Sequence, residues 1–212
     1  MSTITVAKKN GYAAISADSL SSWDSKDSAD YVVNHHKILQ VGENYIAVCG
    51  ATSLKVVLSD YFSSLDTEIH LGSVGHIFTI WKRLHEVLKD EYFMNPEQDE
   101  DDSFESSRMS VLIANRHGIF GVSSHRAVQE FSKFYAYGKG REYALGAMYC
   151  LFADKGKTAE EIARRGVQAA AEFDDSTGLP EISFTVPLSD SAHLRSRSSA
   201  SRIRPTKAKS TK

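Results

Sequence analysis

The residues at the start of the chain are the ones best suited to chemistry. Met1 is followed by Ser2, whose small side chain permits removal of the initiator methionine. Removal would leave a serine that carries both a hydroxyl and a free α-amine, and an α-amine titrates at a pH of ~8, close enough to neutral to act as a general base. A hydroxyl activated by its own amine is an established nucleophile, so Ser2 is a candidate nucleophile. Most proteins that begin Met-Ser use neither group in this way, and the hypothesis depends on the rest of the chain.

Few other residue patterns suggest chemistry. The sequence has no Gly-rich phosphate loop, no GxSxG motif and no pair of histidines at metal-ligand spacing. His35 and His36 are adjacent on a predicted strand, so their side chains should point to opposite faces and cannot share a metal. Cys49 and Cys150 lie in apolar stretches and form neither a metal nor a disulfide pattern. We therefore expect reduced cysteines and no required cofactor.

Length and composition bound the class of protein. The chain has 212 residues, of which 42% are hydrophobic, enough for one domain with its own core. No run approaches the ~18 apolar residues that a membrane helix needs, and the first residues contain no apolar signal-peptide core. The sequence therefore argues against membrane transport and predicts a soluble, cytoplasmic protein.

The net charge of −2 hides an uneven distribution of charge. Residues 189–212 hold seven Lys or Arg against one acid, together with seven serines, and predict a disordered basic tail after a domain over 1–188. Six acids lie between Glu97 and Glu105 with no base among them, so segment 95–107 should be a solvated acidic loop. The tail leaves nucleic-acid binding open as an alternative, but the acidic body, with 18 Lys or Arg against 26 acids, argues against nucleic acid as a partner.

Apolar periodicity predicts an alternation of strand pairs and helix pairs. The predicted strands are 3–9, 12–17, 36–41, 45–49, 109–115, 118–122, 126–131, 134–137 and 182–186. Helical spacing runs over 54–62, 77–88, 141–153 and 158–172. Asn10-Gly11 predicts a hairpin, and Thr158 with Glu161 predicts a capping box. The pattern alone predicts no more than a layered α+β domain. The order of strand pairs and helix pairs suggests a four-layer αββα sandwich of two antiparallel sheets with helices on both outer faces.

Five segments, taken in order, resemble the β-type subunits of proteasomes. MSTITVAKKNGYAAISADS is similar to their opening, particularly that of the bacterial HslV-type peptidase, the proteolytic half of an ATP-dependent protease, and it places Ser2 sixteen residues before Asp18. NHHKI (34–38) resembles the strand that bears the catalytic lysine and points to Lys37. YIAVCGATS (45–53) resembles the strand-to-helix turn of the oxyanion hole and points to Gly50.

The last two segments complete the resemblance. GKGREYALGAM (138–148) is similar to the family's Gly-Ser-Gly motif, with Lys139 at the position of the motif serine. AEFDDSTG (171–178) resembles the second acid and its hydroxyl partner, which gives Asp174 and Thr177. The resemblance spans residues 2–188 and implies the N-terminal-nucleophile (Ntn) hydrolase fold of a proteasome subunit.

The resemblance implies a role for each catalytic residue. Ser2 Oγ would attack a peptide carbonyl, while Lys37 stabilises the developing alkoxide and lowers the pKa of the α-amine by like-charge repulsion. Asp18 would hold Lys37 charged and aimed, although such a pair can also be an ordinary salt bridge. The Gly50 N–H would bind the oxyanion, although a sharp turn from strand to helix also calls for glycine.

The remaining positions leave alternatives open. Asp174 and Thr177 could orient the amine or cap the helix that ends near residue 173. The family's commonest nucleophile is threonine, and Thr3 competes with Ser2 but breaks the sixteen-residue spacing. The side chain of Lys139 either adds a second cation beside the amine or turns away and leaves one hydrogen bond missing.

The resemblance also implies substrate contacts and a possible ion. Val48 would form the base of the pocket for the residue before the cleaved bond and favour apolar residues of moderate size. Backbone groups near Ser21, Ser22 and the segment 50–52, which ends at Thr52, would hold the peptide as an added strand. A structural monovalent or divalent cation could bind carbonyls near Ala171, Asp174 and Thr177.

The acidic loop and the nucleophilic serine suggest a narrower group, the betaproteobacterial proteasome homologues. That resemblance implies a homo-oligomeric double ring, a dodecamer or tetradecamer, that hydrolyses peptides or unfolded proteins at interior sites. A loop of six acids repeated around such a ring would attract basic substrates. The sequence does not determine whether an unfoldase is a partner. An acyl-transfer ligase or a catalytically weak ring scaffold on the same fold is the alternative function.

Overall fold

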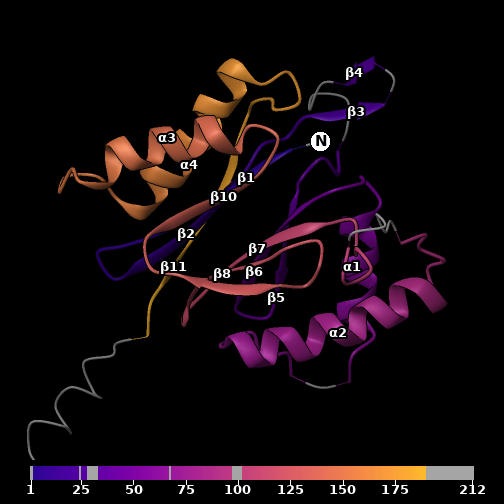
Figure 1. The fold of residues 1–212 in the computed structure, drawn as a ribbon. Helices are drawn as coiled ribbons and strands as arrows, with labels where there is room; N and C mark the ends of the chain where they lie inside the picture. Colours follow the sequence, from indigo (N-terminus) through magenta and orange to yellow (C-terminus); the bar gives the residue numbers. More distant parts are fainter. Residues whose placement is uncertain (1, 24, 28–32, 67, 97–101, 190–212) are drawn as a thin grey trace, which may run out of the picture.

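Two antiparallel sheets lie face to face, and a pair of helices covers the outer face of each (Figure 1). The computed structural model describes residues 2–23, 25–27, 33–66, 68–96 and 102–189. The four-layer αββα sandwich predicted from the sequence is therefore confirmed. Within the described ranges, no helix is both long and apolar enough to cross a membrane.

The first sheet has four strands, and helices α3 and α4 cover it. In spatial order the strands are β10 (Phe134–Gly138), β1 (Thr3–Lys9), β2 (Tyr12–Ala17) and β11 (Ile182–Pro187). The helices are α3 (Arg141–Phe152) and α4 (Ala159–Phe173). Thr158 and Glu161 form the predicted capping box at the start of α4.

The second sheet has five strands, and helices α1 and α2 cover it. The strands are β5 (Ile38–Val41), β6 (Asn44–Cys49), β7 (Ser110–Asn115), β8 (Gly118–Val122) and β9 (Val128–Phe131). The helices are α1 (Leu54–Ser63) and α2 (Val74–Asp90). A small hairpin of β3 (Ser21–Trp23) and β4 (Ser25–Asp27), which the sequence did not predict, projects beside the N-terminus (Figure 1).

The first strand distributes its side chains between two different layers. Ile4 and Val6 lie in the apolar cluster between the two sheets. Ala7 packs on the other side, against Ile162 and its neighbours in α4. Because side chains alternate along a strand, Ser2 shares the face of Ile4, and Thr3 shares the face of Ala7. This alternation decides what each of the first two residues can contact.

Every predicted strand and helix is present, with ends within three residues of the prediction. Asn10 and Gly11 join β1 to β2 with positive φ angles of 52° and 80°, as the hairpin signal predicts. The prediction for the histidine pair is wrong, because β5 begins only at Ile38. His35 and His36 precede the strand, and their rings lie 4.5 Å apart between centroids, not on opposite faces.

Bases from other segments pair with the described part of the acidic loop. Glu105 accepts hydrogen bonds from Lys89 Nζ at 2.7 Å and pairs with His85 Nε2 at 3.1 Å. Asp102 pairs with His125 at 3.2 Å. These bases lie on other segments, so local sequence gave no sign of them. Residues 97–101 of the loop and 190–212 of the tail lie outside the described ranges, and the domain boundary at 188 stays a prediction.

A buried histidine anchors the end of the acidic loop to α2. His85 Nδ1 lies 2.9 Å from Ser107 Oγ, which also accepts from Arg126 at 3.2 Å. When the ring is neutral and Nε2–H donates to Glu105, Nδ1 accepts from the Ser107 hydroxyl. Burial and Arg126 lower the pKa of His85, while Glu105 opposes this shift.

We expect stability to fall in acid because of this network. In the unfolded chain His85 has its ordinary pKa of ~6.5, whereas in the folded chain its pKa is lower. Below that pH the unfolded chain therefore binds more protons than the folded chain. The free energy of unfolding consequently decreases as the pH drops through ~6.5. In His85→Gln this contribution is absent. The melting temperature of the variant should be lower at pH 7.5 and change less between pH 7.5 and 5.5, by circular dichroism. Parallel pH profiles for both proteins would contradict the prediction.

Candidate active site

The carboxylate of Asp18, just after β2, is the centre of a buried hydrogen-bond network. Its Oδ1 accepts from the backbone N–H of Thr3 at 3.0 Å and from Lys37 Nζ at 2.7 Å. Its Oδ2 accepts from the backbone N–H groups of Leu20 and Gly178, both at 3.2 Å. Asp18 is 1% exposed, and four donors match the acceptor capacity of a carboxylate. The sequence prediction of an Asp18–Lys37 pair is thus realised in the geometry.

Burial acts on both partners of this pair. It raises the pKa of the Asp18 carboxyl, against the opposing effects of Lys37 and of the Thr3 and Gly178 N–H groups. It lowers the pKa of the Lys37 ammonium, although Asp18 opposes that shift. Both groups are therefore moved toward their neutral forms. An amine with a lowered pKa exchanges a proton more readily near neutral pH, which suits acid–base chemistry.

Ser2 lies at the start of β1 and is held by its carbonyl group. That oxygen accepts from the backbone N–H of Lys139 at 3.2 Å and faces Cys49 Sγ at 3.7 Å. A Cβ on Gly138, whose φ is +111°, would overlap the same oxygen, so glycine is needed for this close approach. Because Ser2 immediately precedes Thr3, and Thr3 N–H shares Asp18 Oδ1 with Lys37, the nucleophile candidate and the lysine meet at one carboxylate.

A second chain of hydrogen bonds runs from Thr3 to the other predicted acid. Thr177 Oγ1 donates to Asp174 Oδ2 at 2.6 Å. Because its proton is used there, Thr177 Oγ1 accepts from Thr3 Oγ1 at 2.7 Å. Thr3 Oγ1 in turn accepts from the backbone N–H of Gly140 at 3.1 Å. The predicted pair of Asp174 and Thr177 is therefore connected to residue 3 directly, and to Ser2 through the backbone.

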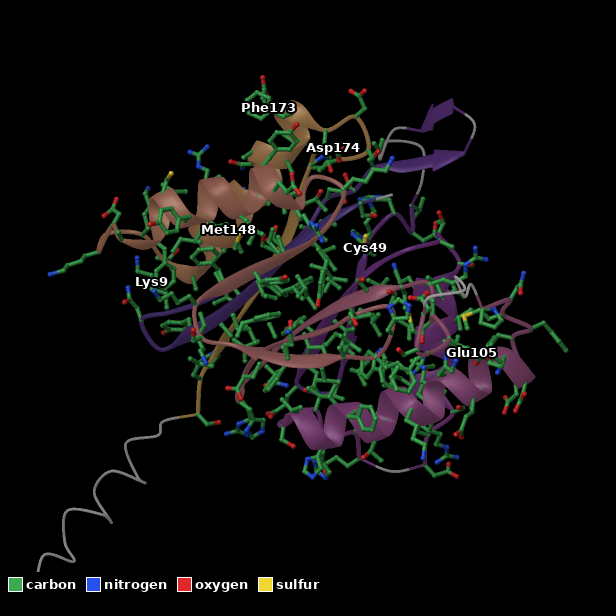
Figure 2. The ribbon with its side chains drawn as sticks, in the orientation of Figure 1. Lys9, Cys49, Glu105, Met148, Phe173 and Asp174 are labelled. Carbon is green, nitrogen blue, oxygen red and sulfur yellow. The ribbon has the colours of Figure 1, made fainter. Side chains whose placement is uncertain are left out.

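The figures place these residues at one end of the molecule. Cys49 and Asp174 lie at the end of the sheets where Figure 1 marks the N-terminus, and Lys9 lies at the opposite end of β1 (Figures 1 and 2). A cavity of about 790 Å³ lies elsewhere, and no predicted site residue lines it. Its walls come from residues 41–44, 68–73, 76, 115–117 and 189.

Lys139 contacts Ser2 through its backbone N–H. The side chain is exposed, and no hydrogen bond or ion pair of its Nζ occurs among the described residues. The two alternatives for the Lys139 side chain, a second cation beside the amine or a side chain that turns away, stay predictions. The turn after β10 contacts Ser2 and Thr3 through two backbone groups, the N–H of Lys139 and the N–H of Gly140.

Gly50 lies at the sharp bend between β6 and α1. A Cβ there would be 2.5 Å from Leu54 Cδ1 and 2.9 Å from the Arg108 carbonyl oxygen, so the turn requires glycine on steric grounds. Its role as an oxyanion donor stays a prediction. The cation site at Ala171, Asp174 and Thr177 also stays a prediction. One of its three carbonyl groups, that of Asp174, accepts a hydrogen bond from the Thr177 N–H at 3.0 Å.

The predicted substrate contacts occupy different environments. Val48 is buried in the core cluster beneath α1, and Thr52 is exposed in the turn before that helix. Ser21 and Ser22 lie in β3, paired with Asp27 and Lys26 of β4, and their side chains are outside the described part. The subsite roles of these four residues stay predictions.

Two neighbours of the site were not assigned to it from the sequence. Thr3 was considered only as a rival nucleophile, but it is fully buried and all its polar atoms are bonded. Cys49 lies in an apolar stretch of the sequence, and the structure places its Sγ 3.7 Å from the Ser2 carbonyl oxygen. Burial raises the pKa of its thiol despite the nearby Lys37. The alternation of side chains along β6 could have predicted this position, because Cys49 lies on the same face as Ala47, toward the layer between the sheets.

The fold is shared with solved structures. No protein-family model and no curated protein matches the chain. BPH of Thiobacillus denitrificans is 53% identical with a TM-score of 0.85, over 88% of this chain and 98% of that one. BPH in complex with epoxomicin is 52% identical with a TM-score of 0.84, over 89% and 100%. Eukaryotic HslV from Trypanosoma brucei is 15% identical with a TM-score of 0.60, over 87% and 99%, and shares the fold.

Fold and similarity together define a proteasome-type subunit of the Ntn-hydrolase class. At 53% identity over 98% of its relative, the chain belongs to the betaproteobacterial proteasome homologues, as the sequence resemblance indicated. It is thus a member of a family of proteasome-type peptidases.

Asp18→Asn should disrupt the site because an amide has only one acceptor oxygen. Two of the four N–H donors would face an NH₂ group, and Lys37 would lose its counter-charge. We expect the free energy of unfolding to fall by about 3–5 kcal/mol and the melting temperature to fall measurably, in thermal melts by circular dichroism. Asp60→Asn removes an exposed carboxylate bonded to Tyr92 and serves as the control. Equal melting temperatures for the two variants would refute the prediction.

Proposed function

We propose that the chain is a peptidase that uses Ser2 as its N-terminal nucleophile after loss of Met1. The observation that carries this proposal is the shared carboxylate oxygen: Asp18 Oδ1 binds both the Thr3 N–H and Lys37 Nζ. A lysine is thereby held beside the peptide that follows Ser2. The family membership supports the same chemistry.

The reaction follows from these positions. Ser2 Oγ attacks the peptide carbonyl, and its proton passes to the α-amine, directly or through a water. Lys37 stabilises the developing alkoxide, and the Gly50 N–H stabilises the oxyanion. The C–N bond breaks as the leaving amine takes the proton, and water then hydrolyses the ester on Ser2. Asp174 and Thr177 orient the start of the chain through Thr3.

The substrate is a peptide or an unfolded protein. Val48 at the base of a pocket favours an apolar residue of moderate size before the cleaved bond. The two-stranded β3–β4 hairpin leaves one edge of β3 free of strand pairing in the described structure, which supports binding of the peptide as an added strand.

We further propose a homo-oligomeric double ring with interior sites, in the cytoplasm. Aromatic side chains on the outer face of α3 and α4 support self-association: Tyr143, Tyr149 and Phe173 are 48%, 76% and 67% exposed. In Figure 2, Phe173 points away from the sheets. Interior sites would need an unfoldase to deliver folded substrates, whereas short or unfolded chains could enter alone.

Intact mass with and without epoxomicin tests the nucleophile. An epoxyketone forms its ring adduct only with a nucleophile that carries its own amine, and a relative has been solved with this compound. We expect loss of Met1 and one adduct per chain in the protein without an N-terminal tag. Ser2→Ala should form no adduct and show only background peptidase activity, and Ser59→Ala, at an exposed serine of α1, should behave as the wild type.

Two outcomes would refute this mechanism. One is clear peptidase activity in pure Ser2→Ala protein. The other is retained Met1 with no adduct, which would favour the ring scaffold. If the adduct forms but an added amine acceptor is joined to the acyl product in place of water, the acyl-transfer ligase is the correct function, since both reactions share the acyl-enzyme step.

A further inference from the structure

We propose that the Thr3 hydroxyl is the positioning group of this site, which holds Ser2 in its reactive orientation through Thr177 and Gly140. This inference rests on the proposed function and names a further residue of the same reaction. Thr3 touches neither the reacting atoms nor the solvent, since it is fully buried. It acts through the peptide that joins it to Ser2.

Every polar atom of Thr3 is committed to a partner. Its N–H donates to Asp18 Oδ1 at 3.0 Å, and its carbonyl accepts from the Asp18 N–H at 3.2 Å. Its hydroxyl donates to Thr177 Oγ1 at 2.7 Å and accepts from Gly140 N–H at 3.1 Å. The Thr3 hydroxyl proton is therefore already donated, and the buried hydroxyl is not accessible for a nucleophilic role. The four bonds fix the position of both the backbone and the side chain of Thr3.

Thr3 links the two acids of the site, one through its backbone and the other through its side chain. The backbone of Thr3 is tied to Asp18, and its hydroxyl reaches Asp174 through Thr177. Asp174 ends α4, and Asp18 follows β2, so one residue joins the helical layer to the sheet beside the nucleophile. β-Branching restricts χ1 of threonine and keeps the hydroxyl directed at Thr177.

The hydroxyl matters because the turn after β10 supplies only backbone contacts. Lys139 N–H binds the Ser2 carbonyl, but its side chain is exposed. Without the Thr3 hydroxyl, Gly140 N–H and Thr177 would lose their shared partner, and the Ser2–Thr3 peptide could rotate. A shift of about 1 Å at a reacting group can cost about 100-fold in rate. The loss should fall on kcat, since Thr3 is too deeply buried to contact substrate.

The test compares Thr3→Val with Thr3→Ser in peptidase kinetics. Valine keeps the branched shape and removes the hydroxyl, so we expect kcat to fall about 10- to 100-fold with KM within about twofold. Serine keeps the hydroxyl and should restore kcat to within about fivefold of the wild type. Epoxomicin labelling of Ser2 should slow in Thr3→Val in proportion to kcat.

Thr5→Val is the matched control. Thr5 lies two residues further along the same face of β1, is equally buried, and donates to the Ala163 carbonyl at 2.9 Å. Its replacement removes a buried hydroxyl outside the site and should leave kcat within about twofold. Equal losses in Thr3→Val and Thr5→Val, or an unchanged kcat in Thr3→Val, would overturn the positioning role.

Thr177→Val tests the same bond from its other end. If the two hydroxyls act as one unit, the double variant Thr3→Val/Thr177→Val should lose no more kcat than the worse single variant. Multiplied losses would overturn the proposal, and Thr177→Val decides the matter alone if Thr3→Val does not fold. A wild type that neither turns over nor labels at Ser2 would refute the proposed function itself. A reactive wild type with an unaffected Thr3→Val would refute only the positioning role.

Discussion

The buried carboxylate of Asp18 is the interaction on which the rest of the site depends. A carboxylate that is 1% exposed is stable only when its oxygens are bonded, and here each oxygen accepts two N–H groups. Its donors Thr3, Lys37 and Gly178 come from the first strand, the segment before β5 and the loop after α4. The network can close only when both sheets and that loop are in place, so the site forms as the fold is completed.

Burial makes charged groups in this network unfavourable unless they are paired, and it also shifts the pKa values of Asp18 and Lys37. Water would stabilise the charges on Asp18 and Lys37, and its exclusion raises the pKa of the acid and lowers that of the lysine. A lysine in this state can stabilise a negative charge and still exchange a proton. Under the proposed mechanism, stability and reactivity both depend on this one ion pair.

The alternation of β1 explains how two neighbouring residues acquire separate tasks. Ser2 faces the layer between the sheets, beside Cys49 of β6, while Thr3 faces α3 and α4. The proposed nucleophile thus lies on the face toward the second sheet, and the residue proposed to position it is bonded to Thr177 and Gly140 on the side of the helical layer. A shift of one residue in the register of β1 would exchange these faces and move the Thr3 N–H away from the Asp18 oxygen that it shares with Lys37.

The sequence alone determined what depends on neighbours along the chain. The Asn10-Gly11 hairpin, the Thr158–Glu161 capping box and the order of strands and helices follow from backbone preference and apolar period, which are local properties. The pairing of Asp18 with Lys37 was also predicted, through resemblance to a family. Tertiary structure alone decided which partners meet across the fold, such as Glu105 with His85 and Thr3 with Thr177. Such contacts join residues up to 174 positions apart, and no local rule specifies them because they depend on how the layers pack.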